Sequence, residues 1–288
     1  MELHAILLLV LAAVIHSVWN LLTKKSLDKQ VFLWLSLVVL SVVCLPVFIY
    51  LFTPFPSKAW IYIISSGALE AVYCILLTKA YQNGDLSLVY PIARGSAPVF
   101  ATLLAVFFLN EYLPPEGIAG ITLIAGGIYT LHIKSLDRQG ILAPLLSLRD
   151  RTSRLSVLTG FTIACYSVVD KVGISHVSPF LYVYLIFAVT AALLTPYMVL
   201  TRSGLVAREW RSNKIMIFAV SLMFLAGYLL VLLAMRTSKV SYVTSVREMS
   251  VVFAAFLGVF MLREPFGRMK ITGSIFIFTG IVLIALAR

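Results

Sequence analysis

The chain has 288 residues, of which 61% are hydrophobic and only 12% are charged, so a water-soluble fold could not bury its apolar surface. Its formal net charge is +11, but the lysines and arginines stand in short segments between apolar runs, which argues against a nucleic-acid-binding face. The three cysteines lie inside apolar runs without paired spacing, so neither a disulfide framework nor a metal site is predicted. We expect an integral membrane protein without a cofactor.

Apolar runs long enough to cross a bilayer follow one another along the chain. A transmembrane helix needs about 20 apolar residues to cross roughly 30 Å of hydrocarbon. The first run is too long for the core of a signal peptide and lacks a cleavage site behind it, so we expect it to remain as a helix. The runs predict an all-α membrane protein with ten transmembrane helices, near 3–23, 31–52, 59–80, 86–109, 116–133, 155–174, 179–200, 214–235, 240–262 and 270–287.

The two halves of the chain resemble one another. The longest polar stretch, 134–154, separates residues 1–133 from residues 155–288, and each half holds five of the ten predicted helices. Four pairs of identical residues lie 153 positions apart: Arg94 and Arg247, Glu111 and Glu264, Gly120 and Gly273, and Gly127 and Gly280. This regular offset predicts two related five-helix units.

Because five is odd, the second unit must be inverted relative to the first, and basic residues should change sides between equivalent loops. They do so in three of four loop pairs; for example, Lys24, Lys25 and Lys29 follow the first helix, whereas the equivalent later loop has little basic charge. We therefore expect an inverted repeat in the plasma (inner) membrane. The linker 134–154 is predicted in the cytoplasm and both termini outside.

Six ionisable residues fall within predicted membrane depth: Glu70, Arg94, Asp170, Lys171, Arg247 and Glu248. If uncompensated, six such charges would cost on the order of 15–20 kcal/mol, so they must pair, face a wet cavity or change protonation. Lys171 is near a helix end and is expected to extend to the interface. The alternative to a functional role is fixed ion pairing, of Arg94 with Glu70, or of Arg247 with Glu248 or Asp170.

Polar side chains share a face on several predicted helices, as Glu70 and Tyr73 do, which predicts a common polar cavity. We expect predicted helices 1, 3, 4, 6, 8 and 9 to line it. Two arginines favour a substrate with a carboxylate or phosphate, and the acids allow a zwitterion. The predicted substrate-binding residues are His16, Asn20, Glu70, Tyr73, Tyr90, Arg94, Tyr166, Asp170, Tyr228, Arg247 and Glu248.

Glu70 is the candidate for proton coupling. It lies near the middle of its predicted helix, where burial disfavours a charged carboxylate while a nearby Arg94 would favour it. If burial dominates, the side chain can gain and lose a proton during transport. If the arginine dominates, Glu70 is a permanently charged structural partner.

No catalytic motif occurs in the context that it needs: there is no phosphate-binding loop after a strand, no H-E-x-x-H and no nucleophile elbow. An intramembrane enzyme would have to rely on His16 and Asp170, which form no specific signature. A channel is the other alternative from a different class.

Three motifs carry a family resemblance: the stretch from Gly84 to Gly95, the pair Asn110-Glu111, and Val169-Asp170-Lys171. With the two five-helix halves, they resemble the EamA family of the drug/metabolite transporter superfamily. The resemblance implies a secondary carrier for a small polar metabolite that works by alternating access, often as an exporter, in contact with membrane lipids and as a monomer or homodimer. A lipid-linked sugar flippase is the nearest alternative.

The second half departs from the first around the intramembrane arginines. Pro91 and Pro98 flank Arg94 but have no counterparts beside Arg247, and Glu248 has no acidic counterpart beside Arg94. The prolines predict an interrupted helix beside Arg94. We expect any asymmetry of the transport cycle to reside here.

Overall fold

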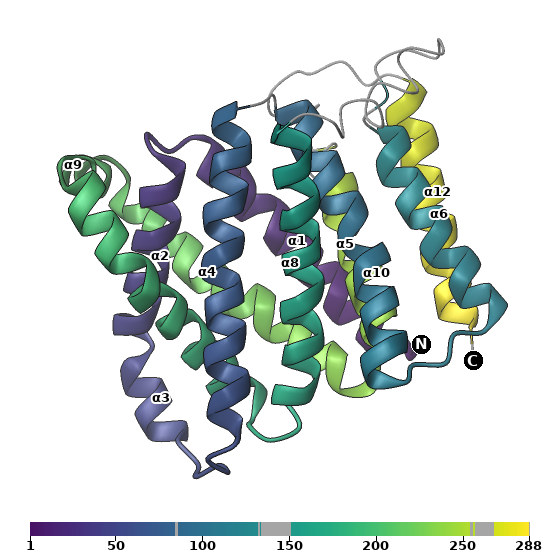
Figure 1. Ribbon diagram of the computed structural model, residues 1–288, viewed down its shortest axis with the longest axis horizontal. Helices are drawn as coiled ribbons and strands as arrows, with labels where there is room; N and C mark the ends of the chain where they lie inside the picture. The colour runs from purple at the N-terminus through teal and green to yellow at the C-terminus, as the bar shows by residue number, and fades with distance from the viewer. Residues whose placement is uncertain (84–85, 132, 134–150, 254–255, 257–267, 288) are drawn as a thin grey trace.

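The computed structural model describes residues 1–83, 86–131, 133, 151–253, 256 and 268–287, apart from the side chains of residues 81–92, 268 and 270. All the regular secondary structure of these residues is α-helix (Figure 1). The helices are α1 (Leu3–Lys24), α2 (Lys29–Val43), α3 (Leu45–Leu51), α4 (Ala59–Asn83), α5 (Leu86–Leu109), α6 (Pro115–Leu131), α8 (Arg151–Gly173), α9 (Pro179–Thr237), α10 (Val240–Arg247) and α12 (Arg268–Leu286).

Several helices suit a bilayer by length and composition. Within the described residues, α1, α4, α8 and α9 are long and apolar enough to cross a membrane, and α2 and α3 meet the same criterion together, as a pair bent by 47°. The bend follows from Pro46 in the first turn of α3, because proline cannot donate a hydrogen bond to the preceding turn. By contrast, α5 runs from Leu86 to Leu109 as one helix, so the predicted interruption at Pro91 and Pro98 is not seen.

The 59 residues of α9 are too many for a single span. A straight helix of that length would measure about 90 Å, roughly three times the hydrocarbon thickness. Its backbone leaves helical geometry at Arg202 and Asn213, near the ends of the two helices predicted there. These breaks allow the two long parts of α9 to pack as separate segments. The count of ten spans stays a prediction.

The glycines that match between the halves lie at the contact of α6 with α12. A β-carbon on Gly120 would lie 2.7 Å from the carbonyl oxygen of Gly280, and one on Gly127 would lie 2.7 Å from that of Gly273. Only glycine permits this approach, so the two glycine faces are used within one chain. The earlier glycine of α6 meets the later glycine of α12, and the later one meets the earlier one, so the two helices run antiparallel, as an inverted repeat requires.

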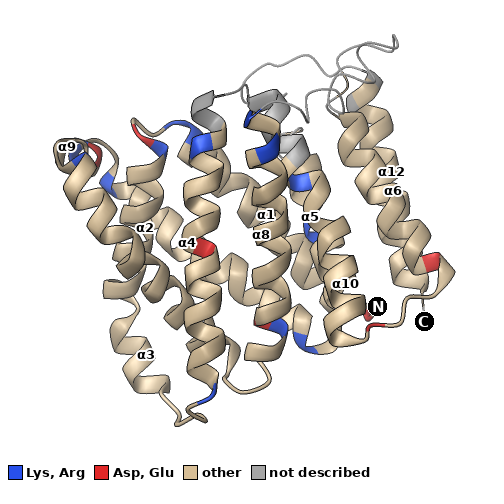
Figure 2. Cartoon of the chain, in the orientation of Figure 1, with Lys and Arg blue, Asp and Glu red and all other residues tan. Residues whose placement is uncertain are grey.

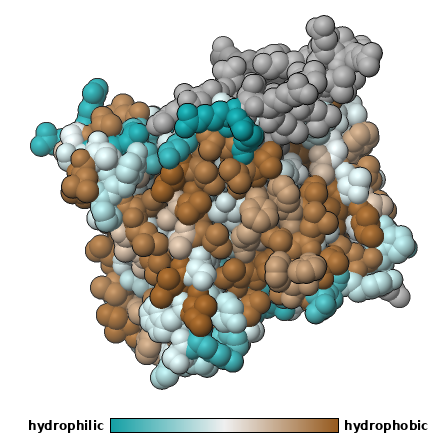
Figure 3. Space-filling model, viewed as in Figure 1, coloured by the Kyte–Doolittle hydropathy of each residue, from teal (hydrophilic) through white to brown (hydrophobic). Residues whose placement is uncertain are grey.

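The helix ends define two opposite faces. The α1–α2 connection and the bent region of α9 lie at one edge, and both chain ends lie at the other (Figure 1). The Met1 ammonium donates to the carbonyl of Ala287 at 3.3 Å, beyond the end of α12, so the two termini touch. Charged residues gather mainly near the helix ends, while apolar side chains cover the middle of the visible surface (Figures 2 and 3). This distribution is typical of a bundle inserted in a bilayer.

Candidate substrate cavity

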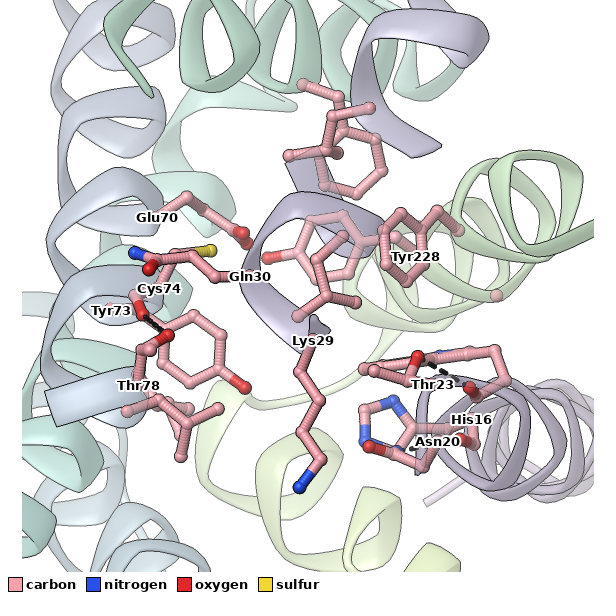
Figure 4. A pocket seen from close by; sticks show the side chains of 18 of the residues that line it. His16, Asn20, Thr23, Lys29, Gln30, Glu70, Tyr73, Cys74, Thr78 and Tyr228 are labelled. Atoms are coloured by element: carbon pink, nitrogen blue, oxygen red, sulfur yellow. Dashed lines mark hydrogen bonds between the residues drawn. The ribbon is translucent and has the colours of Figure 1, made fainter. Parts of the chain in front are cut away.

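A central cavity of about 350 Å³ lies among α1, α2, α4, α5, α8, α9 and α10 (Figure 4). It extends along α1 from Ala12 to Thr23 and reaches the surface beside Leu27, which is 55% exposed. We call the surface end, formed by Leu27, Asp28, Lys29, Gln30 and Arg202, the cavity mouth. Residues of α2, and Phe187 and Arg202 of the first long part of α9, were not predicted to contribute to the lining, so that prediction was incomplete.

Arg94 joins the two halves of the chain beside the cavity. Its Nη1 donates to Glu248 Oε1 at 3.0 Å, and both side chains are at least 95% buried. Its Nη2 also contacts His16 Nε2, so α5, α10 and α1 meet at one guanidinium. The predicted pairs, Arg94 with Glu70 and Arg247 with Glu248 or Asp170, do not occur among the described residues. The true partner could not be read from the sequence because it lies 154 positions away in the other half.

Arg247 and Glu70 present the remaining opposite charges to the cavity. Both line it, and within the described part of the chain neither forms an ion pair. The Arg247 guanidinium lies over the ring of Tyr228, 5.4 Å from the ring centre, which is a cation–π geometry. A ligand in this cavity would therefore meet one cation and one acid that the protein has not paired with each other.

Asp170 is fully buried and does not line the cavity. Its carboxylate accepts hydrogen bonds from the hydroxyl of Tyr182, at 3.0 Å, and from that of Tyr228. Tyr228 thus contacts the arginine in the cavity through its ring and the buried acid through its hydroxyl. Neither Asp170 nor Glu248 is among the residues that line the cavity, and their contact with a substrate stays a prediction.

Aromatic rings form much of the remaining wall. Trp19 packs edge-on against Phe224 with ring centres 4.8 Å apart, and Phe187 lies 5.6 Å from Tyr228. The sequence analysis did not single out Phe187 or Phe224, because apolar residues in a membrane helix carry no signal of the direction they face. These rings give the cavity apolar as well as charged surface.

Gln30 is a cavity residue that the sequence analysis also missed. Its side chain is only 6% exposed, and its Oε1 has no hydrogen-bond partner. Gln30 lies in the first turn of α2, where the Asp28 carboxylate accepts from its backbone N–H at 3.0 Å. An Asp at the N-cap just before an apolar run predicts where a helix starts. It does not predict that the following glutamine turns inward.

A set of polar contacts ties the cavity mouth to α9. The Arg202 guanidinium binds the Asp28 carboxylate, and each side chain is 19% exposed. The backbone N–H of Asp28 donates to Glu209 Oε2 at 2.7 Å, and the amide of Asn213 donates to Glu209 Oε1 at 2.5 Å. Both breaks in α9, at Arg202 and Asn213, therefore belong to one network with the α1–α2 connection.

The opposite face is held at the turn between α9 and α10. Glu111 Oε1 accepts from the backbone N–H of Val240 at 2.5 Å, and its Oε2 accepts from the Ser241 hydroxyl at 2.5 Å. The Lys171 ammonium donates to the carbonyls of Met235 and Ser238, at 2.5 and 3.0 Å. An acid at the start of α10 and a cation at the end of α9 both suit the helix dipoles. We call this the closed face; Lys171 stands in the last turn of α8, and its extension to the membrane interface stays a prediction.

The predicted site residues thus divide into groups. Five of them, labelled in the close view, surround one space: His16, Asn20, Glu70, Tyr73 and Tyr228 (Figure 4). Arg94, Tyr166 and Arg247 also line the cavity. The side chain of Tyr90 and the whole of Glu264 lie outside the described residues. In the part of the chain that the structure describes, no group of three histidine, cysteine or acidic side chains could hold a metal ion.

Comparison with known proteins bears on the whole chain. The family model described as the EamA-like transporter family matches the chain twice, at residues 3–132 and 154–286. No curated protein gives a significant match. A solved structure described only as "Crystal structure of protein" is 16% identical, with a TM-score of 0.77 over 99% of this chain and 98% of its own. At that identity it shows the shared fold alone.

Proposed function

Because the chain belongs to the EamA-like transporter family, we propose that it is a secondary carrier whose substrate binds in the central cavity. The observation that supports this most is the pair of cavity charges, Arg247 and Glu70, which the protein leaves without an ion-pair partner among the described residues. Unpaired charges inside a membrane are costly, so they are kept where a ligand or water compensates them.

The chemistry of the cavity favours a zwitterion over a simple anion. Arg94 is compensated by Glu248, so it adds no net positive charge to the site, and Arg247 remains as the group for a carboxylate. Glu70 supplies an acceptor for an ammonium group. The rings of Trp19 and Phe224 suit an apolar side chain on the same molecule. We infer a small amino acid-like substrate with an apolar or aromatic side chain.

The cavity mouth and the closed face support alternating access. The cavity reaches the surface at the mouth, whereas Glu111 and Lys171 hold the α9–α10 turn on the other side. The proposal places the mouth in the cytoplasm of a plasma membrane, because the basic segments lie on that face. An alternating-access carrier needs this state, open to one face, and a second state that is open to the other face. An open channel would connect both faces at once.

Glu70 is proposed to couple transport to protons. The arginine that would have kept it charged, Arg94, is bound to Glu248 instead. Arg247, the other intramembrane arginine that lines the cavity, is the proposed substrate site, so a bound substrate and a proton on Glu70 both change the charge balance there. In Glu70→Gln, a lowered exchange should remain, because the amide oxygen can still accept from the ammonium group, while accumulation driven by a pH gradient is lost. Gradient-driven accumulation by Glu70→Gln at the wild-type level would remove Glu70 from coupling.

The function is tested by counterflow in proteoliposomes. Vesicles loaded with unlabelled phenylalanine or leucine should take up the labelled amino acid transiently above equilibrium, and empty vesicles should not. Uptake that is insensitive to the internal amino acid would indicate a channel. Chemical conversion of the substrate would indicate an enzyme. Arg247→Gln is the control variant, expected to lower exchange about 10- to 100-fold through loss of a charged hydrogen-bond partner.

A further inference from the structure

The segment 203–212 between the two breaks of α9 has one face turned toward the protein. Arg202, Val206, Glu209 and Asn213 are all buried or half-buried and recur every three or four residues, which is one side of a helix. Glu209 is only 1% exposed. The acidic residue of this segment is therefore turned inward, where two hydrogen bonds compensate it.

The other side of the segment is basic and apolar. Arg208 and Arg211 are exposed, and so is Lys214, just beyond the break at Asn213 that ends the segment. Leu205 and Trp210 beside them are 39% and 44% exposed. A short helix with basic residues, an exposed tryptophan and no outward acid has the composition of an interfacial membrane helix.

We propose that segment 203–212 lies in the membrane surface and binds anionic phospholipid headgroups, and that this contact is transmitted to the cavity mouth. Arg208, Arg211 and Lys214 bind the phosphates, while Leu205 and Trp210 enter the headgroup layer. The occupant is a lipid rather than a soluble polyanion because the exposed apolar side chains stand beside the basic ones and need a hydrocarbon boundary.

The transmission runs through Glu209. Its Oε2 accepts from the Asp28 backbone at 2.7 Å, and Asp28 in turn binds Arg202 and accepts from the N–H of Val31 at the start of α2. Asp28 and Arg202 both line the cavity. A shift of the segment on the membrane surface would therefore move two residues of the mouth.

Lipid binding is tested without any transport assay. Thermal unfolding of the purified full chain in neutral detergent is measured with added phosphatidylglycerol or phosphatidylcholine. Phosphatidylglycerol should raise the Tm by about 5 °C more than phosphatidylcholine. The variant Arg208→Gln/Arg211→Gln/Lys214→Gln should lose most of this difference, and the control Lys25→Gln/Arg151→Gln/Arg154→Gln should keep it. Equal loss in both variants, no difference in wild type, or an equal shift with heparin would overturn the proposal.

The transmission to the mouth rests on the proposed carrier function. Phenylalanine exchange should be several-fold faster in vesicles with phosphatidylglycerol than in pure phosphatidylcholine, and Glu209→Ala should abolish this stimulation while keeping the lipid-dependent rise in Tm. Stimulation that persists in Glu209→Ala would overturn the transmission. If wild type exchanges nothing in either lipid, the proposed function fails, and the Tm result still decides lipid binding.

Discussion

The interior and the cavity mouth hold their ion pairs in different surroundings. In the interior, Arg94 and Glu248 are 5% and 2% exposed and bind each other across the two halves. At the mouth, Asp28 and Arg202 are each 19% exposed and bind at the edge of an open cavity. A buried pair cannot lose one member cheaply, whereas a partly solvated pair can. The comparison implies that the interior ion pair stays formed throughout the transport cycle, whereas the ion pair at the mouth can break and form again.

The largest expected effect on stability comes from breaking the interior ion pair of Arg94 with Glu248. Arg94→Met leaves the Glu248 carboxylate buried without its cation, which should cost about 3–5 kcal/mol of stability, measured by thermal unfolding in detergent. In Arg94→Met/Glu248→Met both charges are gone, so most of the stability should return. A double variant as unstable as the single one would show that the uncompensated charge is not the cause.

A middle-sized effect is expected at the closed face. Glu111→Gln weakens the acceptor at the start of α10 and should favour opening there by about 1–2 kcal/mol, a factor of about 5–30 in population. Cys74 lines the cavity and reports this opening. In a Cys44→Ser/Cys165→Ser background, an impermeant maleimide added from the closed side should label Cys74 several-fold faster. The exposed Glu116→Gln on the same face is the control, and equal labelling in both variants would contradict the role of Glu111.

The smallest effect is expected at the mouth. Asp28→Asn keeps a good N-cap for α2 but removes the ion pair with Arg202, so stability should fall by at most about 1 kcal/mol. Thermal unfolding measures the change, with Lys25→Gln as a control of the same face. A loss as large as that of Arg94→Met would erase the contrast between the two regions.

Sequence patterns predicted where the helices lie better than how they meet. The predicted run 86–109 matches α5, and the predicted 59–80 lies inside α4, because an apolar run of span length admits one structure in a bilayer. The bend at Cys44 was missed because the apolar run continues through Pro46. The internal repeat predicted two related halves but not that its matching glycines meet where α6 contacts α12.

The candidate site was predicted only in part, because the argument followed ionisable residues. That route selected Glu70, Arg94 and Arg247, which line the cavity, together with Asp170 and Glu248, which are not among the lining residues. In an almost wholly apolar helix, the neighbouring helices decide which side chains face the cavity. The sequence of the helix itself contains no pattern that predicts this orientation. The partner of each charge therefore depended on the three-dimensional packing.

The central claim is that Arg247 and Glu70 together select a zwitterion. Its most direct test is competition for phenylalanine exchange by phenethylamine, which lacks the carboxylate, and by 3-phenylpropionate, which lacks the ammonium group. The account predicts that both compete about 10- to 100-fold less well than phenylalanine in wild type, that Arg247→Gln removes the penalty for phenethylamine, and that Glu70→Gln removes the penalty for 3-phenylpropionate. Unchanged discrimination in both variants would contradict the account.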